Sequence, residues 1–239
     1  MNVLMIGNSY TVDCSRYLHR IARAGGFQLN TTCLYIGGCP LERHFRNMHS
    51  GEDAYELYVN GESSGFKVSL AEALTNRSWD VITFQQASFQ SYDYETYQPY
   101  LDELADYARI LCPKAKFIIH QTWPDADTSS RLEGFGFENN GQMFKALEAA
   151  YEKAAEAIGA ADIVRDGQLI YSLYEAGLNP VWRDTGHISL GIGRYAAGLL
   201  WYAKLTGGDI WENTFADFDV PVSEEEVQII KKCVSEVLK

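Results

Sequence analysis

The sequence predicts one α/β domain over residues 1–239, a three-layer α/β/α sandwich around a mostly parallel five-stranded sheet. Short apolar runs alternate along the chain with longer segments of helical periodicity, which is the pattern of βαβ units. The 239 residues contain no repeat, no low-complexity linker and no shift in composition that would mark a second domain. Hydrophobic residues make up 46% of the chain and charged residues 22%, as in ordinary globular proteins of a length that can bury a sizeable core.

Five short apolar runs, bounded by glycine or polar residues, are the expected strands. In chain order they are Asn2–Gly7, Leu29–Ile36, Asp80–Phe84, Lys116–Gln121 and Ala161–Arg165. The segments with helical spacing are Cys14–Gly25, Tyr97–Leu111, Asn140–Ile158, Ser189–Leu205 and Ser223–Leu238. Two of these helices carry start signals, because Ser189 is a candidate N-cap and Ser223 forms a capping-box pattern with Glu226.

One segment interrupts this alternation of strands and helices. Tyr55–Ser69 predicts two short strands around Asn60-Gly61, a β-hairpin inserted into a loop of the α/β frame. Within it, Gly61–Gly65 matches the G-x-S-x-G nucleophile motif of α/β-hydrolases. That motif requires a strand before it and a helix after it, so a hairpin is the better interpretation.

Composition limits the partners and the compartment. A formal net charge of -12 argues against nucleic acid or an anionic membrane and favours a neutral or weakly charged small molecule. No stretch approaches the roughly 18 apolar residues of a membrane span, and Met1 leads at once into the first expected strand, without a signal peptide. Five cysteines without a Cys-x-x-Cys pair favour free thiols in the cytoplasm, although Cys33 and Cys39 are close enough in sequence to raise the question of a bridge.

Ser9 is the first candidate for chemistry. It follows the expected strand Asn2–Gly7 directly, and ligands of open parallel sheets bind beyond the carboxyl ends of the strands. A helix starting behind the serine would add backbone N–H donors for a developing oxyanion. The alternative is that Asn8, Ser9 and Thr11 are only turn and capping residues.

Asp184 and His187 are the second candidate, in a loop after the last expected strand. A serine hydroxyl is a weak nucleophile until a base accepts its proton, and a carboxylate that fixes the tautomer of a histidine makes it a better base. The alternative is that Asp184 caps a turn and His187 is a surface residue. The five histidines show no metal-ligand spacing, so neither a metal nor an organic cofactor is expected.

These blocks resemble those of the SGNH hydrolases, the superfamily of GDSL-type esterases and lipases. Gly7-Asn8-Ser9 is similar to its first block, with Asn8 where Asp is usual, and Asp184–His187 is similar to its last block. The resemblance implies a flavodoxin-like fold, with Ser9 as nucleophile, His187 as base and Asp184 orienting the base. It also implies that a glycine after the second strand donates its N–H to the oxyanion; here that glycine is Gly38, with Gly37 the weaker candidate.

The third block departs from the family pattern, which places an oxyanion-binding Asn after the third strand. This chain has Gln85, Gln86 and Ser88 there, and resembles a branch of the superfamily with Gln and Ser in this block. Gln85 is the favoured oxyanion donor because it follows the strand immediately, while Gln86 and Ser88 remain alternatives. Loss of one oxyanion donor can lower turnover by about 10²–10³-fold, so this departure bears on rate more than on fold.

Several further residues are expected at the pocket wall. Gln121 and Trp123 follow the fourth strand, Tyr10 follows Ser9, and Trp182 lies just before Asp184. Trp123 has the shape to stack on a sugar ring or an acyl group, although a buried core Trp is an equal alternative. The expected reaction is hydrolysis of a short acyl ester, an acetyl group on a carbohydrate. The alternatives are an acyltransferase with the same three residues, or a weakly active or inactive carbohydrate-binding protein.

Overall fold

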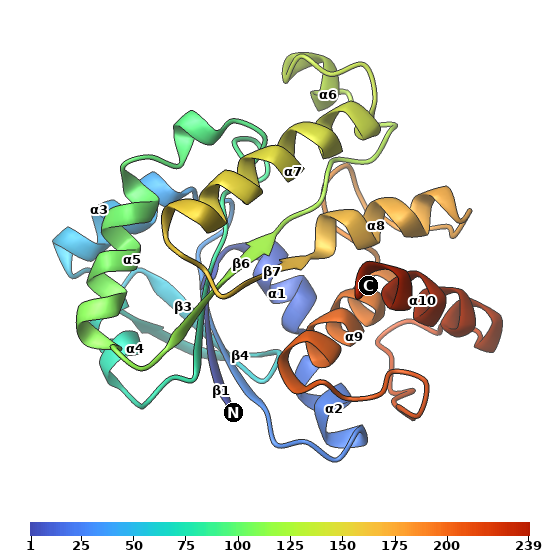
Figure 1. Cartoon of the computed structure of the whole chain (residues 1–239), viewed down its shortest axis with the longest axis horizontal. Helices are drawn as coiled ribbons and strands as arrows, with labels where there is room; N and C mark the ends of the chain where they lie inside the picture. Colours follow the sequence, from blue (N-terminus) through green and yellow to red (C-terminus); the bar gives the residue numbers. More distant parts are fainter.

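Five parallel strands form the centre of the structure, a computed structural model that describes residues 1–239 (Figure 1). In the order in which they lie side by side, they are β2 (Asn30–Tyr35), β1 (Asn2–Gly7), β5 (Val81–Phe84), β6 (Lys116–Gln121) and β7 (Asp162–Arg165). All five coincide with predicted strands, which confirms the parallel sheet. Numbered along the chain, the parallel strands have the order 2-1-3-4-5 of flavodoxin-like folds.

A hairpin extends this sheet beyond β2. Its strands β3 (Tyr55–Val59) and β4 (Glu62–Val68) are joined by Asn60 and Gly61, whose φ angles of 53° and 86° suit a type I′ turn. β3 pairs antiparallel with β2, so the sheet has seven strands, and the prediction of five is wrong in this detail. The hairpin covers backbone groups that would be unpaired at the edge of β2, a long-range pairing that strand periodicity does not reveal.

Helices surround the sheet and connect its strands. In chain order they are α1 (Ser9–Ser15), α2 (Leu18–Ala24), α3 (Leu41–Ser50), α4 (Leu70–Thr75), the 3₁₀ helix η1 (Tyr94–Thr96), α5 (Tyr100–Leu111), α6 (Arg131–Gly134), α7 (Asn140–Ala157), α8 (Asp166–Glu175), α9 (Ile192–Thr206) and α10 (Glu224–Val237). The predicted helix Cys14–Gly25 is wrong as a single element, because it is two helices and the first begins at Ser9. The capping box of Ser223 and Glu226 is confirmed at the start of α10.

Four α-helices, α3, α4, α6 and α8, and the 3₁₀ helix η1 lie outside the sequence prediction. The helices α4 and α6 are short, with six and four residues. The helix α3 carries Leu41, Phe45 and Met48 at helical spacing, an apolar stripe that the sequence prediction missed. The helix α8 follows β7 without a loop, and its first residues are Asp166 and Gly167.

Two hydrophobic cores lie on opposite faces of the sheet. The helices α1, α2, α8, α9 and α10 cover one face, and α3, α4, α5 and α7 cover the other (Figure 1). Along β1, Val3 and Met5 belong to the first core, while Leu4 and Ile6 belong to the second. This alternation is the two-residue period of a strand with both faces buried, which is why its sequence is a continuous apolar run.

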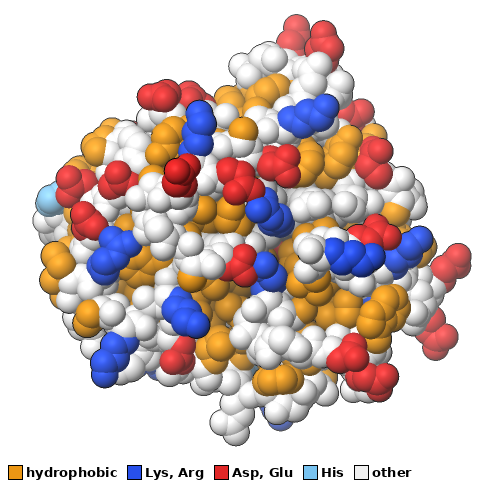
Figure 2. Space-filling view, viewed as in Figure 1, with side chains coloured by type: hydrophobic (Ala, Val, Ile, Leu, Met, Phe, Trp, Pro, Cys, Tyr) orange, Lys and Arg blue, Asp and Glu red, His pale blue; other side chains and the backbone are white.

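The surface carries charges of both signs. Figure 2 shows acidic and basic side chains interspersed over one face of the molecule, with hydrophobic atoms between them. All five cysteines are free, and the question of a bridge between Cys33 and Cys39 is answered in favour of thiols. No helix combines the length and the hydrophobicity needed to cross a membrane.

His44, in α3, is expected to make the stability of the fold sensitive to acid. Burial, together with the nearby positive charge of Arg43, lowers the pKa of His44 to about 3, far below the usual histidine value of about 6.5. Between these two pH values the unfolded chain binds a proton that the folded chain refuses. The free energy of unfolding therefore falls as pH falls through this window, by about 1.4 kcal/mol per pH unit from this group.

Urea unfolding of His44→Gln between pH 7 and pH 4 measures this contribution. The variant is expected to lose stability less steeply than the wild-type protein in this range. His49→Gln is the matched control, since His49 is an exposed histidine on the same helix. Equal slopes for the wild-type protein and His44→Gln would contradict the assignment.

Candidate active site

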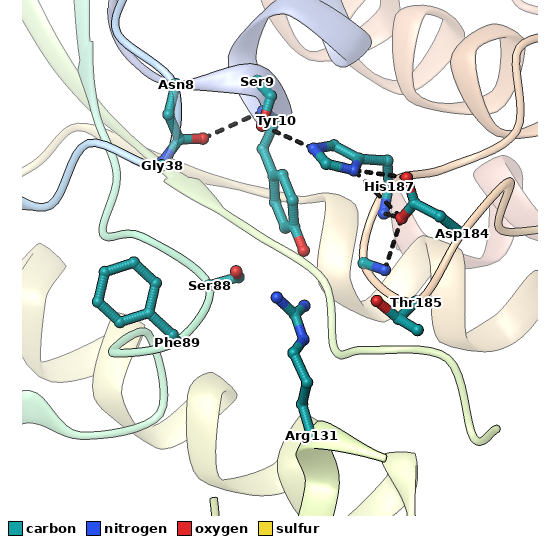
Figure 3. A pocket seen from close by; sticks show the side chains of 11 residues that line it. Asn8, Ser9, Tyr10, Gly38, Ser88, Phe89, Arg131, Asp184, Thr185 and His187 are labelled. Carbon is teal, nitrogen blue, oxygen red and sulfur yellow. Dashed lines mark hydrogen bonds and ion pairs between the residues drawn. The ribbon is translucent and has the colours of Figure 1, made fainter. Parts of the chain in front are cut away.

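The carboxyl ends of β1 and β5 meet where the order of the parallel strands reverses, the usual place for a ligand in such a sheet. A cavity of about 280 Å³ opens there (Figure 3). It is lined by residues from five separate parts of the chain: Asn8, Ser9, Tyr10, Gly38, Ser88, Phe89, Arg131, Asp184, Thr185, Gly186 and His187. Four of the predicted blocks thus converge on one cavity, because parallel strands all end at the same edge of the sheet.

Ser9 is placed by the sharp connection between β1 and α1. β1 ends at Gly7, and Asn8 is the extended N-cap residue of α1, with its side-chain Oδ1 accepting a hydrogen bond of 3.1 Å from the N–H of Tyr10. The helix therefore starts at Ser9, and the serine hydroxyl lies at the wall of the cavity.

Ser9, His187 and Asp184 form one chain of hydrogen bonds (Figure 3). His187 Nε2 lies 2.9 Å from Ser9 Oγ, across 178 residues of sequence. The other ring nitrogen, Nδ1, lies 2.8 Å from Asp184 Oδ2. With Nδ1 donating to the carboxylate, Nε2 is left unprotonated and able to accept the proton of the serine.

Asp184 is held as a carboxylate. Burial raises its pKa, but hydrogen bonds outweigh that effect and lower the pKa to about 2. Asp184 Oδ1 accepts from the N–H of Gly186 at 2.8 Å and from the N–H of His187 at 2.7 Å, and the imidazole of His187 adds a further contact. The charge of Asp184 is therefore present at any pH above about 3 and fixes the orientation of the ring.

The backbone N–H groups of Ser9 and Gly38 are among those at the cavity that have no hydrogen-bond partner in the protein. Gly38 has a φ of 59°, in the left-handed region that favours glycine. Gly37, the weaker candidate from sequence, does not line the cavity. The pair of free donors beside the serine hydroxyl is the arrangement that an oxyanion requires.

Gln85 lies behind the cavity wall and does not line it, which corrects the expectation that its amide faces the oxyanion. Its Nε2 donates to Asn8 Oδ1 at 2.7 Å, and its Oε1 accepts from the hydroxyl of Thr11. Asn8 Nδ2 in turn donates to the carbonyl of Cys39 at 3.3 Å. A Cβ on Gly7 would lie 2.0 Å from Thr11 Oγ1, so this packing also explains the glycine of the first block.

Gln86 and Ser88, the alternatives to Gln85, lie in different surroundings. Gln86 is fully buried, with its Oε1 accepting from the N–H of Leu41 at 3.0 Å and its Nε2 donating to the carbonyl of Thr96 at 3.0 Å. It connects α3 to the segment before α5 and does not line the cavity. Ser88 does line the cavity, at its end near Tyr10 Oη (Figure 3).

The aromatic residues predicted at the pocket wall have separate positions. Tyr10 lines the cavity, whereas Trp123 is completely buried beneath it, its ring stacked on Tyr10 with centroids 4.2 Å apart. The indole N–H of Trp123 donates to the carbonyl of Gly186 at 2.7 Å. Trp123 therefore supports the site from behind, and the expectation that it stacks on a sugar is wrong.

Gln121 and Trp182 also lie away from the cavity. Gln121 is buried, and its Oε1 accepts from the N–H of Gln168 at 3.1 Å, so it joins β6 to α8. Trp182 lines a neighbouring groove of about 630 Å³, which shares Asp184 and Thr185 with the cavity. The groove and the cavity thus adjoin each other at the segment that carries Asp184.

Two residues at the site escape sequence reasoning: Asp13 and Arg131. Asp13, in α1, is buried and binds the guanidinium groups of Arg183 and Arg194 at 2.9 Å and 2.8 Å, which joins the helix behind Ser9 to the segment before His187. Asp125 is buried and pairs with Arg131 at the cavity. No signal in the sequence sets Asp13 or Arg131 apart, because each lies among other polar residues.

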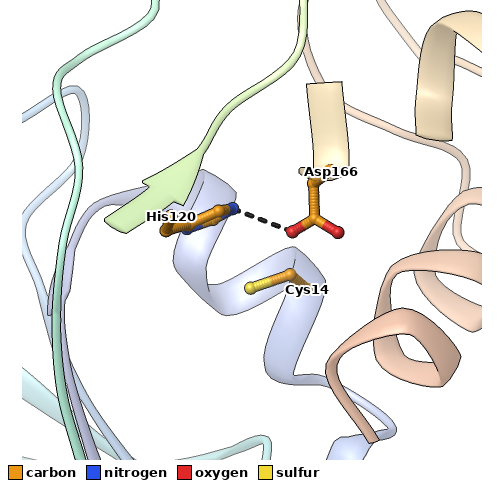
Figure 4. Close-up of side chains that lie close together, drawn as sticks. All are labelled: Cys14, His120 and Asp166. Carbon is orange, nitrogen blue, oxygen red and sulfur yellow. Dashed lines mark ion pairs between the residues drawn. The ribbon is translucent and has the colours of Figure 1, made fainter. Parts of the chain in front are cut away.

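A buried group of possible metal ligands lies behind the site, formed by Cys14, His120 and Asp166 (Figure 4). Their donor atoms lie within 4.8 Å of one another. His120 Nε2 is 3.0 Å from Asp166 Oδ2, which also accepts from the indole N–H of Trp201 at 2.7 Å. Burial raises the pKa of Cys14, and its Sγ donates to the carbonyl of Thr11 at 3.3 Å. Trp201 and Thr11 thus bind two members of the group, which is completely buried.

Known proteins share this architecture. A DUF4886 family protein from Bacteroides uniformis ATCC 8492 is 29% identical in sequence, with a TM-score of 0.92 over 100% of this chain and 94% of its own. A GDSL-like lipase from Parabacteroides merdae ATCC 43184 has a TM-score of 0.57 at 13% identity, over 86% of this chain and 95% of its own. LAE5, an alpha/beta hydrolase enzyme from the metagenome of Lake Arreo, Spain, has a TM-score of 0.55 at 14% identity, over 86% and 96%.

The last two likenesses show that the fold is shared with GDSL-like hydrolases. No curated protein matches the chain. Residues 2–236 match a family model described as a domain of unknown function, DUF4886. Because this match spans nearly the whole sequence, the chain belongs to the DUF4886 family.

Proposed function

We propose that this protein is a serine esterase that hydrolyses short acyl esters through an acyl-enzyme on Ser9. The observation that carries the proposal is the continuous chain of hydrogen bonds from Ser9 Oγ through His187 to Asp184, at 2.9 Å and 2.8 Å. Nucleophile, base and orienting carboxylate stand in the order that activates a serine. The fold shared with GDSL-like hydrolases supports the same reaction class.

The reaction follows from these positions. His187 Nε2 accepts the proton of Ser9 as Oγ forms a bond to the ester carbonyl carbon, and Asp184 stabilises the resulting imidazolium. The carbonyl oxygen becomes an oxyanion, which the N–H groups of Ser9 and Gly38 bind. His187 then returns the proton to the departing alcohol as the C–O bond breaks. A water molecule then attacks the acyl-enzyme while His187 accepts its proton. The bond between the acyl group and Ser9 Oγ breaks as His187 returns the proton to Oγ, which releases the acid and restores Ser9.

Gln85 has a positioning role in this proposal. Its amide holds the side chain of Asn8, whose own oxygen caps the helix that begins at Ser9. An Asp in place of Asn8 would lose the N–H that binds the carbonyl of Cys39. The Asn of the first block and the Gln of the third block are thus one hydrogen-bonded unit, which fixes the connection on which Ser9 sits.

The cavity favours a short acyl group on a polar alcohol. At about 280 Å³ it is small, and Tyr10 and Phe89 are the only hydrophobic residues among those that line it. A long lipid chain would find little apolar surface there. An acetyl ester on a carbohydrate fits this lining, and the neighbouring groove beyond Asp184 offers room for the rest of the sugar.

Labelling with a fluorophosphonate, which reacts with activated serines, tests the proposal directly. We expect the wild-type protein to gain one adduct, mapped by mass spectrometry to the peptide that contains Ser9, and to hydrolyse p-nitrophenyl acetate and acetylated sugars. Ser9→Ala is expected to gain none. Product that forms only when a sugar acceptor is added would show that the protein is an acyltransferase and not a hydrolase. Absence of both adduct and turnover in folded protein would refute an esterase.

A further inference from the structure

Arg131 presents a fixed positive group to the cavity that the proposed hydrolysis does not use. It is the first residue of α6, and its guanidinium is held by two parallel hydrogen bonds to Asp125, from Nε at 2.7 Å and from Nη2 at 2.6 Å. Asp125 is completely buried and also accepts from the hydroxyl of Ser129 at 3.0 Å. The plane of the guanidinium is therefore fixed, while Nη1 makes no hydrogen bond within the protein.

The hydroxyl of Tyr10 is a second unused donor in the same part of the cavity. Tyr10 is only 4% exposed, and its ring is held against Trp123. Its Oη makes no well-formed hydrogen bond in the protein, although the side chain of Ser88 lies beside it. In Figure 3 this hydroxyl points toward Ser88 and the guanidinium of Arg131. Buried hydroxyl groups are normally hydrogen-bonded, so this one indicates that a ligand supplies the acceptor.

The segment that carries His187 passes directly over these donors. A Cβ on Gly186 would lie 2.7 Å from Arg131 Nη2 and 3.0 Å from Tyr10 Oη, so the glycine permits this approach. The donors thus belong to the same cavity as Ser9, beside the residue that precedes His187. A group bound there would be part of the molecule whose ester bond reaches Ser9.

We propose that Arg131, Tyr10 and Ser88 form a subsite for a carboxylate of the substrate, so that the ester cleaved is carried by an acidic molecule such as an acylated sugar acid. This proposal rests on the proposed esterase function. A guanidinium and two hydroxyls supply N–H and O–H donors and no fixed negative charge, which suits a carboxylate better than a neutral sugar hydroxyl.

The neighbouring carboxylates already have hydrogen-bond partners in the protein, so they do not exclude a carboxylate of the substrate. Asp125 is completely buried, and the hydrogen bonds of its carboxylate are to Arg131 and Ser129. Asp184 is the only acidic residue that lines the cavity, and the N–H groups of its own segment and His187 already bind it. The net charge of -12 suggested a neutral substrate, but the local arrangement of donors favours an anion.

Paired substrates test this subsite by turnover. On the acyl side, p-nitrophenyl monoesters of succinic, glutaric and adipic acids are compared with the butyrate, valerate and hexanoate. On the alcohol side, 4-acetoxybenzoate is compared with its methyl ester. We expect the wild-type protein to prefer the charged member of at least one pair. Arg131→Gln should reduce that ratio of kcat/KM values about ten- to hundredfold.

Further variants separate charge recognition from stability. Arg131→Gln leaves the Asp125 charge buried without a partner, so the double variant Asp125→Asn/Arg131→Gln is measured alongside it. Arg131→Lys is expected to restore part of the preference. Arg46→Gln is the matched control, because Arg46 is an exposed arginine of α3 that does not line the cavity. It should leave the ratio unchanged.

Binding to Ser9→Ala protein keeps the two proposals apart. Ligand-observed NMR with glucuronate and with glucose is expected to show binding of glucuronate only, and loss of that binding when Arg131→Gln is added. This result would support the subsite even if no esterase activity were found. A different outcome is that the wild-type protein and Arg131→Gln both hydrolyse the charged and the neutral substrate of each pair at equal rates. That result would overturn the subsite but not the esterase. Absence of both turnover and glucuronate binding would overturn both.

Discussion

Ser9→Ala is expected to lower kcat for ester hydrolysis by about 10⁴–10⁶-fold, the largest effect of any single substitution in this chain. The variant removes the oxygen that would attack the carbonyl, while the free N–H groups of Ser9 and Gly38 remain in place. Residual activity above the uncatalysed rate is therefore expected from oxyanion binding alone. Initial rates on p-nitrophenyl acetate measure the loss.

Two comparisons sharpen this result. His187→Ala should cause a loss of similar size, and the double variant should be no worse than either single one, because the two residues act as a unit. Stability provides the control: Ser9 Oγ bonds only to His187 on the cavity wall, so the unfolding curve of Ser9→Ala should match that of the wild-type protein. A folded Ser9→Ala protein with wild-type turnover would exclude Ser9 as the nucleophile.

Asp13→Asn is expected to lower the free energy of unfolding by about 3–5 kcal/mol, the range for breaking a buried ion pair. The Asp13 side chain is 1% exposed and binds Arg183 and Arg194, which leaves two like charges facing an uncharged amide in the variant. Arg183 also donates to the carbonyl of Ile188, beside His187. We therefore expect kcat to fall as well, since the distance between His187 and Ser9 depends on this connection.

Urea unfolding and turnover of the same preparations check this expectation. Asp217→Asn is the matched control, because Asp217 pairs with Arg20 but has a side chain that is 79% exposed, and exposed pairs contribute less than about 1 kcal/mol. If Asp13→Asn were as stable and as active as Asp217→Asn, the buried network would have no role in holding α1 against the segment of His187.

The departures from the SGNH pattern in the first and third blocks have one structural explanation. Judged from the sequence alone, Asn8 stands where the family usually has Asp, and Gln85 would replace the family's oxyanion-binding Asn. In the structure the two amides bind each other, with Gln85 also held by Thr11. Amide side chains carry both donors and acceptors, so their orientation depends on which neighbours surround them, and the sequence does not contain that information.

The sequence by itself was sufficient to predict the parallel strands and the proximity of the Ser9 and His187 side chains. Apolar runs such as Asn2–Gly7 are strands because both faces of the sheet are covered, and parallel strands bring all their carboxyl ends to one edge. Only the tertiary structure decided the pairing of the hairpin with β2, the burial of Trp123 and the exposure of Arg131 at the cavity. Those features depend on contacts between residues far apart in the chain, whereas periodicity reports only what each segment buries.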